Sequence, residues 1–255
     1  MAELQIEVSG YIATVTLNRP PVNATGRTLR ADITAAFDAM GDRDDVRVVI
    51  LTGAGHTFSA GADVKERTLL SGDAGEYAAL NRLVREMFYS IIECPKPVIA
   101  AVNGHALGAG MALALCCDIL LASDTAVFGM PEIDVGLAGG VKYLQRHLSP
   151  SKVRRLLLTG QRIPAVELYR LGVLEECVAC DRLMPTARAI AAEIAGKSPV
   201  AVRMLKESFG MVENLSLRDG YRIEQNITRQ LSQTEDAREA QRAFIEKRPP
   251  VFKGR

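Results

Sequence analysis

A single glutamate stands out in the most apolar part of this sequence. The stretch 96–140 is rich in apolar and glycine residues, and Glu132, directly after Pro131, is its only glutamate. An apolar environment disfavours the charged form of a carboxyl group, which suits it to accept and return protons near neutral pH. We therefore expect Glu132 to be an acid–base residue, and a capping or ion-paired glutamate is the structural alternative. If this segment were a strand, Asp134 would share its face and would be a second candidate.

Two glycine-rich segments, 53–63 and 103–110, each follow an apolar run of strand length. Glycine leaves backbone N–H groups accessible, and the start of a helix adds unpaired donors and partial positive charge. Two amides that converge on one oxygen form an oxyanion hole, in which loss of one donor costs roughly a hundred- to a thousandfold in rate. Alternatively, these glycines serve only tight turns and close helix packing. The spacing does not match the glycine pattern of a dinucleotide site or of a phosphate loop.

Composition excludes several other classes of function. The chain has 255 residues, 48% of them hydrophobic and 24% charged, with a net charge of +1, so no nucleic-acid partner is predicted. The N-terminus lacks the basic and apolar regions of a signal peptide, and the run 111–122 is too short to span a bilayer. We predict a cytoplasmic protein without a membrane partner. The five cysteines are expected to be buried thiols, and neither a metal site nor a hydrolytic triad has a recognisable spacing.

Strand patterns are concentrated in the first part of the chain. Alternating apolar residues on both sides of Ser9-Gly10 predict a β-hairpin. The unbroken apolar runs that precede the two glycine-rich segments predict strands buried on both faces, and ligands of α/β proteins usually bind where such strands end. The predicted strands are residues 4–8, 12–17, 46–51, 98–102, 119–122 and 126–128.

Helical spacing separates these strands and takes over after Ser149, with residues 173–178 the main strand-like exception. The stripe 80–91 is a helix that prolines stop before the next strand, and 111–116 is a short helix buried all round. We therefore predict one α/β core, residues 1–195, followed by a helical region, residues 196–255.

Five motifs occur in order along nearly the whole chain. They are FSAGADVKE (58–66), KPVIAAVNGHALGAGMALALCCD (96–118), PEIDVG (131–136), LLLTGQRIPA (156–165) and AFIEKRPPVFKGR (243–255). Together they resemble the crotonase, or enoyl-CoA hydratase/isomerase, superfamily. The resemblance implies a ββα spiral core with two nearly perpendicular sheets and a C-terminal helical trimerisation region. It also implies a homotrimer or a homohexamer, an acyl-CoA thioester as substrate, and no separate cofactor, because CoA is part of the substrate.

The resemblance also assigns roles to residues by motif position. The backbone amides of Ala60 and Ala109 would hold the thioester oxygen and stabilise an enolate. Ala109 stands where many relatives have glycine, and alanine suffices if its φ is negative, since the donor is the amide. The C-terminal tail approaches CoA in this family, which suggests a phosphate contact. The implied substrate-binding residues are Ala60, Gly61, Ala62, Asp63, Ala109 and Lys253.

The acid–base pattern departs from that of the usual hydratases. These relatives carry two glutamates, and this sequence has Glu132 at one position and Ala112 at the other. The dienoyl-CoA isomerase branch is similar over 129–140, but its two assisting acidic residues correspond to Ala112 and Gly140. An alanine methyl can neither accept a proton nor orient water. A one-glutamate enoyl-CoA isomerase requires only Glu132 among these residues.

The sequence therefore predicts an acyl-CoA enzyme of the hydratase/isomerase family with Glu132 as the proton-transfer residue. Single-glutamate isomerisation and other enolate chemistry, such as decarboxylation or thioester hydrolysis, are the alternatives. A catalytically weak acyl-CoA-binding subunit is a further alternative, which the alanine at position 112 motivates. The preferred acyl group depends on the loop 68–76 and on helix placement, and the sequence does not predict it.

Overall fold

The computed structural model describes residues 2–68 and 72–255, and its strands form two sheets. The strands are β1 (Leu4–Ser9), β2 (Ile12–Leu17), β3 (Val48–Gly53), β4 (Thr57–Ser59), β5 (Val98–Val102), β6 (His105–Leu107), β7 (Ile119–Ser123), β8 (Val127–Gly129), β9 (Ile163–Pro164) and β10 (Glu176–Val178). The larger sheet has the order β1-β2-β3-β5-β7-β10, and the smaller has the order β4-β6-β8-β9.

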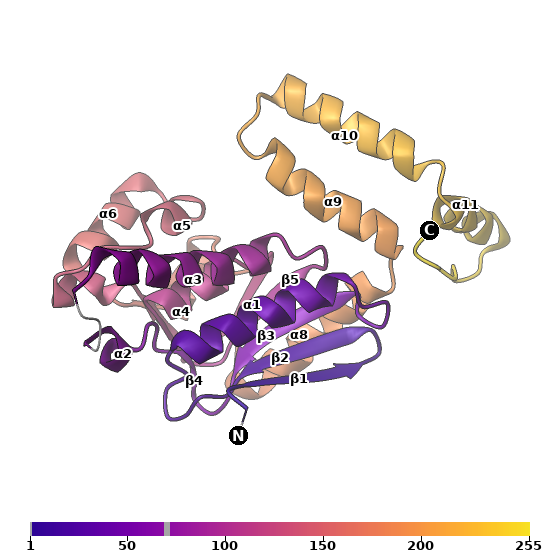
Figure 1. The fold of residues 1–255 in the computed structure, drawn as a ribbon. Coiled ribbons are helices and arrows are strands. Elements are labelled where there is room, and N and C mark those ends of the chain that lie inside the picture. Colours follow the sequence, from indigo (N-terminus) through magenta and orange to yellow (C-terminus); the bar gives the residue numbers. More distant parts are fainter. Residues whose placement is uncertain (1, 69–71) are drawn as a thin grey trace.

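Most of the helices pack around these sheets, and the last ones extend away from them (Figure 1). They are α1 (Arg27–Gly41), α2 (Val64–Thr68), α3 (Ala74–Ile92), α4 (Ala109–Leu115), the 3₁₀ helix η1 (Pro131–Val135), α5 (Val141–Gln145), α6 (Pro150–Thr159), α7 (Ala165–Arg170), α8 (Cys180–Ala195), α9 (Pro199–Val212), α10 (Leu217–Leu231) and α11 (Glu235–Glu246). Within the described residues, no helix is both long and apolar enough to cross a membrane.

The larger sheet begins with the predicted hairpin, in which Ser9 of β1 lies opposite Ile12 of β2. From β2 onward the neighbouring strands run parallel. All residues of β3 are buried, as its unbroken apolar run predicts. Val49 and Leu51 pack in the core that α1 shares, whereas Val48 and Ile50 pack with residues of α8. The alternation of side chains along the strand thus places one half of β3 in each core.

Three short strands have no counterpart in the sequence prediction. β4 and β6 have three residues each and lie inside the two glycine-rich segments, and β9 has two residues. Strands of this length are too short for an alternating pattern to be recognised. They matter for function, because β4 pairs with β6 in parallel and so brings the two glycine-rich segments side by side.

The C-terminal helices leave the core after α8 ends at Ala195. Figure 1 shows α9 and α10 as a hairpin that stands away from the sheets, with α11 and the C-terminus on one side of the molecule. The predicted division between residues 195 and 196 falls at the end of α8, and an independent status for the two parts stays a prediction. Residues 196–198 connect α8 to α9. Side-chain contacts hold α9 against the core.

A buried lysine provides one of these contacts. Lys206 Nζ lies 2.8 Å from Asp118 Oδ2 and 2.9 Å from the Lys96 carbonyl oxygen, and its side chain is only 8% exposed. The same Asp118 oxygen accepts a hydrogen bond of 2.7 Å from the Val98 amide. Asp118 therefore joins the start of β5 and the residues after α4 to α9.

We expect Asp118→Ala to lower the free energy of unfolding by about 3 kcal/mol, because it leaves the buried Lys206 ammonium and the Val98 amide without their acceptor. Asp45→Ala is the matched control, since it removes an exposed pair with Arg43 and should cost less than about 1 kcal/mol. Urea denaturation of both variants measures the difference. Equal losses would contradict the structural role of Asp118.

Candidate active site

Glu132 lies in η1, the 3₁₀ helix that follows β8. The helix ends at Gly136, whose φ is 71°, and the Leu137 amide donates to the Glu132 carbonyl at 2.9 Å. The Glu132 side chain is half-buried, and its Oε2 atom is shielded from solvent. It lies against the second glycine-rich segment, because a β-carbon added to Gly108 would be 2.7 Å from Glu132 Oε1. The expected acid–base group thus adjoins the start of α4.

The two acidic side chains of η1 point in different directions. Asp134 packs at the end of α6, where a β-carbon on Gly160 would lie 2.7 Å from Asp134 Oδ1. A 3₁₀ helix has three residues per turn, so residues two apart lie on different sides, whereas a strand would have placed both on one side. Asp134 therefore does not share the face of Glu132, and its contact with Gly160 favours the structural alternative.

The first glycine-rich segment corrects the expected position of one amide donor. The Ala60 N–H already donates to the Val22 carbonyl at 2.9 Å, so it is occupied within the protein. Ala60 is therefore not a suitable oxyanion donor. Within the described part of the chain, the Ala62 N–H has no protein acceptor. The candidate donor moves two residues along the same motif, from Ala60 to Ala62.

The second glycine-rich segment supplies the other candidate donor. Gly108 has a φ of 53° and precedes the first residue of α4, Ala109, whose amide has no acceptor among the described residues. The φ of Ala109 is not positive, which meets the condition under which alanine can replace glycine here. An amide at the start of a helix also carries part of the positive end of the helix dipole.

The two segments touch at glycines. A β-carbon on Gly61 would lie 2.5 Å from the Leu107 carbonyl oxygen and 3.2 Å from the Ala109 nitrogen. Gly110 packs equally closely on Ser59, where an added β-carbon would overlap the carbonyl oxygen. Larger residues would push the segments apart. The Ala62 and Ala109 amides thus belong to adjoining loops, and Glu132 lies against Gly108, the residue before Ala109.

Comparison with known proteins gives this arrangement a family. A sequence profile of the enoyl-CoA hydratase/isomerase family matches residues 7–255. The chain belongs to this family. It is 37% identical over 250 residues to a protein of Dictyostelium discoideum described as "Probable enoyl-CoA hydratase, mitochondrial", covering 96% of this chain and 89% of that protein. It is also 36% identical to the carnitinyl-CoA dehydratase of Proteus mirabilis, covering 99% and 98% of the two chains.

Solved structures confirm the predicted crotonase fold. The crystal structure of an enoyl-CoA hydratase from Bacillus anthracis superposes with a TM-score of 0.95 at 32% identity, and the match covers 100% of both chains. An enoyl-CoA hydratase subunit from Geobacillus kaustophilus gives a TM-score of 0.92 at 35% identity, covering 100% of this chain and 99% of that chain. The prediction of an enzyme of the hydratase/isomerase family is therefore confirmed at the level of the family.

The position at which the resemblance predicts a second glutamate holds a buried alanine, whose methyl group has no acid–base function. Ala112 is 3% exposed in α4, and its amide donates to the Gly108 carbonyl at 3.1 Å. The other position at which the dienoyl-CoA branch has an acidic residue is Gly140, which has a φ of 75°. A β-carbon there would lie 2.8 Å from the Met130 side chain. Local packing thus leaves no room for a larger side chain at Gly140 without movement of Met130.

Asp63 is held by groups of the protein itself. Its Oδ2 atom accepts a hydrogen bond of 2.6 Å from Arg19, and its Oδ1 atom accepts one of 2.9 Å from the Lys65 amide at the start of α2. The hydrogen bond from Arg19 lowers the pKa of the Asp63 carboxyl below its ordinary value. The carboxylate therefore holds the loop in place through these hydrogen bonds. A contact between Asp63 and CoA would have to use the Asp63 backbone.

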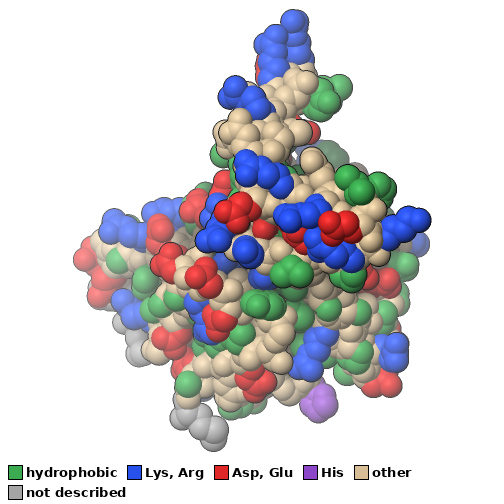
Figure 2. Space-filling view, turned by 90° about the vertical axis from the view of Figure 1, so that its right-hand side faces the viewer, with side chains coloured by type: hydrophobic (Ala, Val, Ile, Leu, Met, Phe, Trp, Pro, Cys, Tyr) green, Lys and Arg blue, Asp and Glu red, His purple; other side chains and the backbone are tan. Residues whose placement is uncertain are grey.

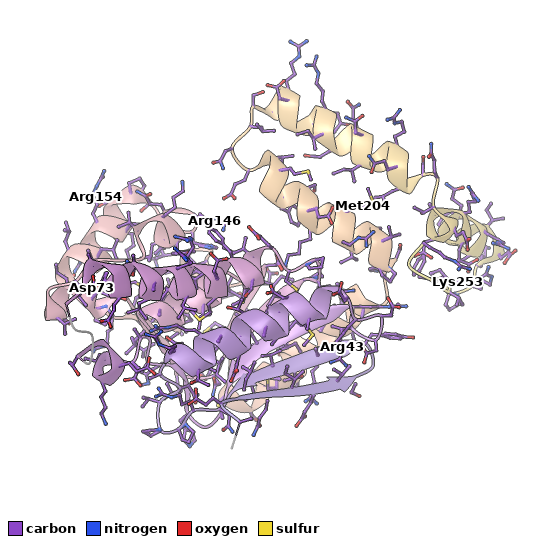
Figure 3. All side chains as sticks on the ribbon, viewed as in Figure 1. Arg43, Asp73, Arg146, Arg154, Met204 and Lys253 are labelled. Atoms are coloured by element: carbon purple, nitrogen blue, oxygen red, sulfur yellow. The ribbon has the colours of Figure 1, made fainter. Side chains whose placement is uncertain are left out.

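Lys253 lies far from the rest of this site. Figure 3 places Lys253 beside α11, and Figure 1 shows β4 and α4, which belong to the two glycine-rich segments, on the other side of the molecule. The amides of Lys253 and Gly254 donate to the buried Asp236 carboxylate at 2.7 and 3.0 Å, which fixes the tail in this place. Within one chain, the structure does not bring Lys253 to the glycine-rich loops.

Sequence reasoning missed the residues that cradle the first loop. Asn23 is 1% exposed, has a φ of 51°, and donates its side-chain amide to the carbonyls of Ala54 and Thr57 at 3.1 and 2.7 Å. Its carbonyl accepts the Ser59 hydroxyl at 2.7 Å. The segment RPPVNATG carries only a turn signal, because its partners lie more than thirty residues away. A buried asparagine with positive φ is visible only in the structure.

The thiols lie apart from this site. Cys94, Cys116 and Cys117 are buried as expected, and burial raises the pKa of Cys117 well above its ordinary value. Two thiols differ from the prediction: Cys177 is half-buried, and Cys180 is exposed because it occupies the first turn of α8 at the surface. Among residues 2–68 and 72–255, no group of three or more His, Cys, Asp or Glu side chains is arranged to hold a metal ion.

We expect Gly108→Ala to lower enoyl-CoA turnover by roughly a hundredfold, because the added methyl group would displace the Glu132 carboxylate and shift the start of α4. Gly136→Ala is the control, since Gly136 also has a positive φ but has open space around its missing β-carbon. It should lower stability by about 1 kcal/mol and leave turnover within a few-fold. The measurement is the steady-state turnover rate of each variant, normalised to the amount of folded protein, which circular dichroism determines. Similar rates for the two variants would contradict the contact.

Proposed function

We propose that this family member isomerises a 3-enoyl-CoA to the conjugated 2-enoyl-CoA, with Glu132 as the single proton carrier. The observation that carries the proposal is the position of Glu132 against Gly108, next to amide donors, while position 112 holds a buried alanine. The neighbouring acid, Asp134, packs against Gly160. One carboxylate is enough for this reaction, because the proton that leaves one carbon returns to another.

The reaction has two proton-transfer steps. Ionised Glu132 removes a proton from C2 of the 3-enoyl thioester, and the electron pair of the broken bond moves toward the thioester oxygen, giving a dienolate. The amides of Ala62 and Ala109 donate hydrogen bonds to this oxygen as its negative charge grows. The protonated Glu132 then returns the proton at C4, which leaves the double bond between C2 and C3. No atom is gained or lost.

Hydration requires more than this site supplies. Water must be held and deprotonated while C2 is protonated, and relatives with two glutamates divide this work between two groups. The methyl group of Ala112 can do neither task. We therefore rank isomerisation above hydration. The acyl preference stays open, because residues 69–71 of the loop 68–76 lie outside the described residues.

Glu132→Gln tests the proposed proton carrier. We expect isomerisation of trans-3-hexenoyl-CoA to fall by roughly a thousandfold, since a positioned acid–base group contributes about 10²- to 10⁴-fold. Asp134→Asn is the matched control, because it removes the nearby carboxylate that packs elsewhere, and it should keep the rate within a few-fold. The scheme would be overturned if the Glu132→Gln variant isomerised the substrate at the wild-type rate. Fast hydration of crotonyl-CoA by the wild-type protein would overturn it as well.

The reverse experiment restores the missing glutamate. Ala112→Glu should raise crotonyl-CoA hydration at least tenfold over Ala112→Gln, which has a side chain of the same shape without the carboxylate. Because Ala112 is buried, both variants must first be shown to fold by thermal unfolding. Equal hydration rates for the two variants would show that a carboxylate at this position does not complete a hydratase here.

The buried alanine also favours a second candidate, an acyl-CoA-binding subunit without turnover. One measurement distinguishes the two candidates. It is the exchange of the C2 protons of a bound acyl-CoA with solvent deuterium. Exchange that depends on Glu132 supports the enzyme. Tight binding without exchange or turnover of any thioester, including decarboxylation and hydrolysis substrates, supports the binding subunit.

We further propose that Lys253 contacts the CoA phosphates of a neighbouring copy in a homotrimer. Its distance from the loops of its own chain supports this reading (Figure 3). Figure 2 shows basic side chains gathered on the face that carries the C-terminus. There Lys253, Lys96 and Arg203 line a hollow of about 450 Å³. The helical region also exposes large apolar side chains that a partner could cover, among them Leu205, Phe209, Leu217, Phe244 and Ile245.

A homohexamer and a cytoplasmic location stay predictions.

Mixed assemblies test this contact. Lys253→Ala should weaken acyl-CoA binding roughly tenfold, because a hydrogen bond to a charged group contributes about 1.5 kcal/mol. When Lys253→Ala is co-assembled with Glu132→Gln, some sites combine an intact Glu132 with Lys253 of the other chain, and we expect part of the activity to regain the wild-type KM. An unchanged dissociation constant removes the contact, and a KM that mixing does not restore assigns Lys253 to its own chain.

A further inference from the structure

The segment between β2 and α1 contains an arginine that no motif of the chain explains. Arg19 donates from Nε to Glu3 at 3.0 Å, from Nη1 to the Ala24 carbonyl at 2.8 Å, and from Nη2 to Asp63 at 2.6 Å. Its side chain is 27% exposed, and that of Asp63 is 12% exposed. One guanidinium thus connects the N-terminus, the segment before α1 and the loop of the candidate oxyanion hole.

Two of these partners flank a short β-bridge that holds Ala62. Thr25 and Ala62 pair in parallel. The Thr25 amide donates to the Gly61 carbonyl at 2.7 Å, its hydroxyl donates to the same oxygen at 3.2 Å, and the Asp63 amide donates to the Thr25 carbonyl at 3.3 Å. Ala24 directly precedes Thr25, and Asp63 directly follows Ala62. Arg19 therefore ties the two sides of the bridge together at its ends.

The bridge determines where the Ala62 amide points. The carbonyl of Gly61 and the N–H of Ala62 belong to one peptide unit, which is planar and trans, so the two groups point in opposite directions. Because Thr25 holds the Gly61 oxygen with two donors, the Ala62 N–H is turned away from Thr25. A shift of either side of the bridge would rotate this peptide unit.

The following helix is anchored by the same cluster. The Asp63 Oδ1 atom accepts from the Lys65 amide at 2.9 Å, at the start of α2. Glu66 of α2 in turn accepts from the Arg27 amide at 2.7 Å, at the start of α1. The loop before Ala62 and the helix after it are therefore both fixed to the segment that carries Arg19.

We propose that Arg19 is a positioning residue for the oxyanion hole, which clamps the Thr25 segment to Asp63 so that the Ala62 N–H is aimed at the thioester oxygen. This role rests on the proposed function, in which Ala62 is one of the two donors. Arg19 acts through the loop and does not touch the substrate. Lysine cannot replace it fully, because an ammonium group lacks the planar fork that reaches a carboxylate and a carbonyl in fixed directions.

The test measures polarisation of the bound thioester carbonyl directly. In a Glu132→Gln background, which stops turnover, the infrared stretching frequency of a ¹³C-labelled thioester carbonyl is compared between free and bound crotonyl-CoA. We expect binding to lower this frequency, and Arg19→Gln, Arg19→Lys and Asp63→Asn each to reduce the lowering by at least half at saturating ligand. Arg43→Gln is the matched control, since it removes an exposed pair with Asp45 and should leave the shift unchanged.

Kinetics give a second readout. With Glu132 intact, Arg19→Lys should lower kcat about tenfold and change KM less than threefold, because a misaimed donor weakens transition-state stabilisation more than binding. An undiminished carbonyl shift in Arg19→Gln and Arg19→Lys would overturn the positioning role and leave the proposed reaction intact. No shift on binding to the Glu132→Gln parent would remove the oxyanion hole itself, and the role of Arg19 with it. If binding to the Glu132→Gln parent lowers the carbonyl frequency as expected but the wild-type protein does not isomerise its substrate, the proposed reaction is contradicted and the positioning role of Arg19 is not.

Discussion

The close approach of two glycine-rich segments is the constraint on which this site depends. Gly61 lies against Leu107 and Ala109, and Gly110 lies against Ser59, at distances that leave no space for a β-carbon. The pairing of β4 with β6 holds the segments in this register. Backbone amides are the useful groups here, and the two segments that carry them can approach this closely only where glycines replace larger residues. The absence of side chains at these glycines is therefore as important as any functional group.

The position of the proposed catalytic carboxylate depends on the same packing. Glu132 reaches Gly108 because η1 is a 3₁₀ helix, which separates its side chain from that of Asp134. In an extended segment the two acids would have pointed to one side, and each would have disfavoured ionisation of the other. The helical turn leaves one carboxylate at the loops and places the other at the end of α6. This separation fits a mechanism in which one group carries the proton in both steps.

The polar contacts behind the loops support our proposal of how this chain fixes the direction of the Ala62 amide. A peptide N–H has no side chain to orient it, so its direction must be set through the carbonyl of the same peptide unit. The double contact of Thr25 with the Gly61 oxygen does this, and Arg19 and Asn23 hold the surrounding segments. At the other end of the chain, Asp236 fixes the tail in a comparable way.

The sequence alone determined the α/β class, the main strands, the family and Glu132, because these depend on apolar periodicity and on motifs that are contiguous in the chain. It also revealed the alanine at position 112. Only the tertiary structure decided that Ala62 rather than Ala60 has the available amide. The Ala60 amide donates to the carbonyl of Val22, which lies 38 residues earlier in the chain. The short strands and the place of Lys253 likewise follow from contacts between segments that lie apart in the sequence, which no local pattern encodes.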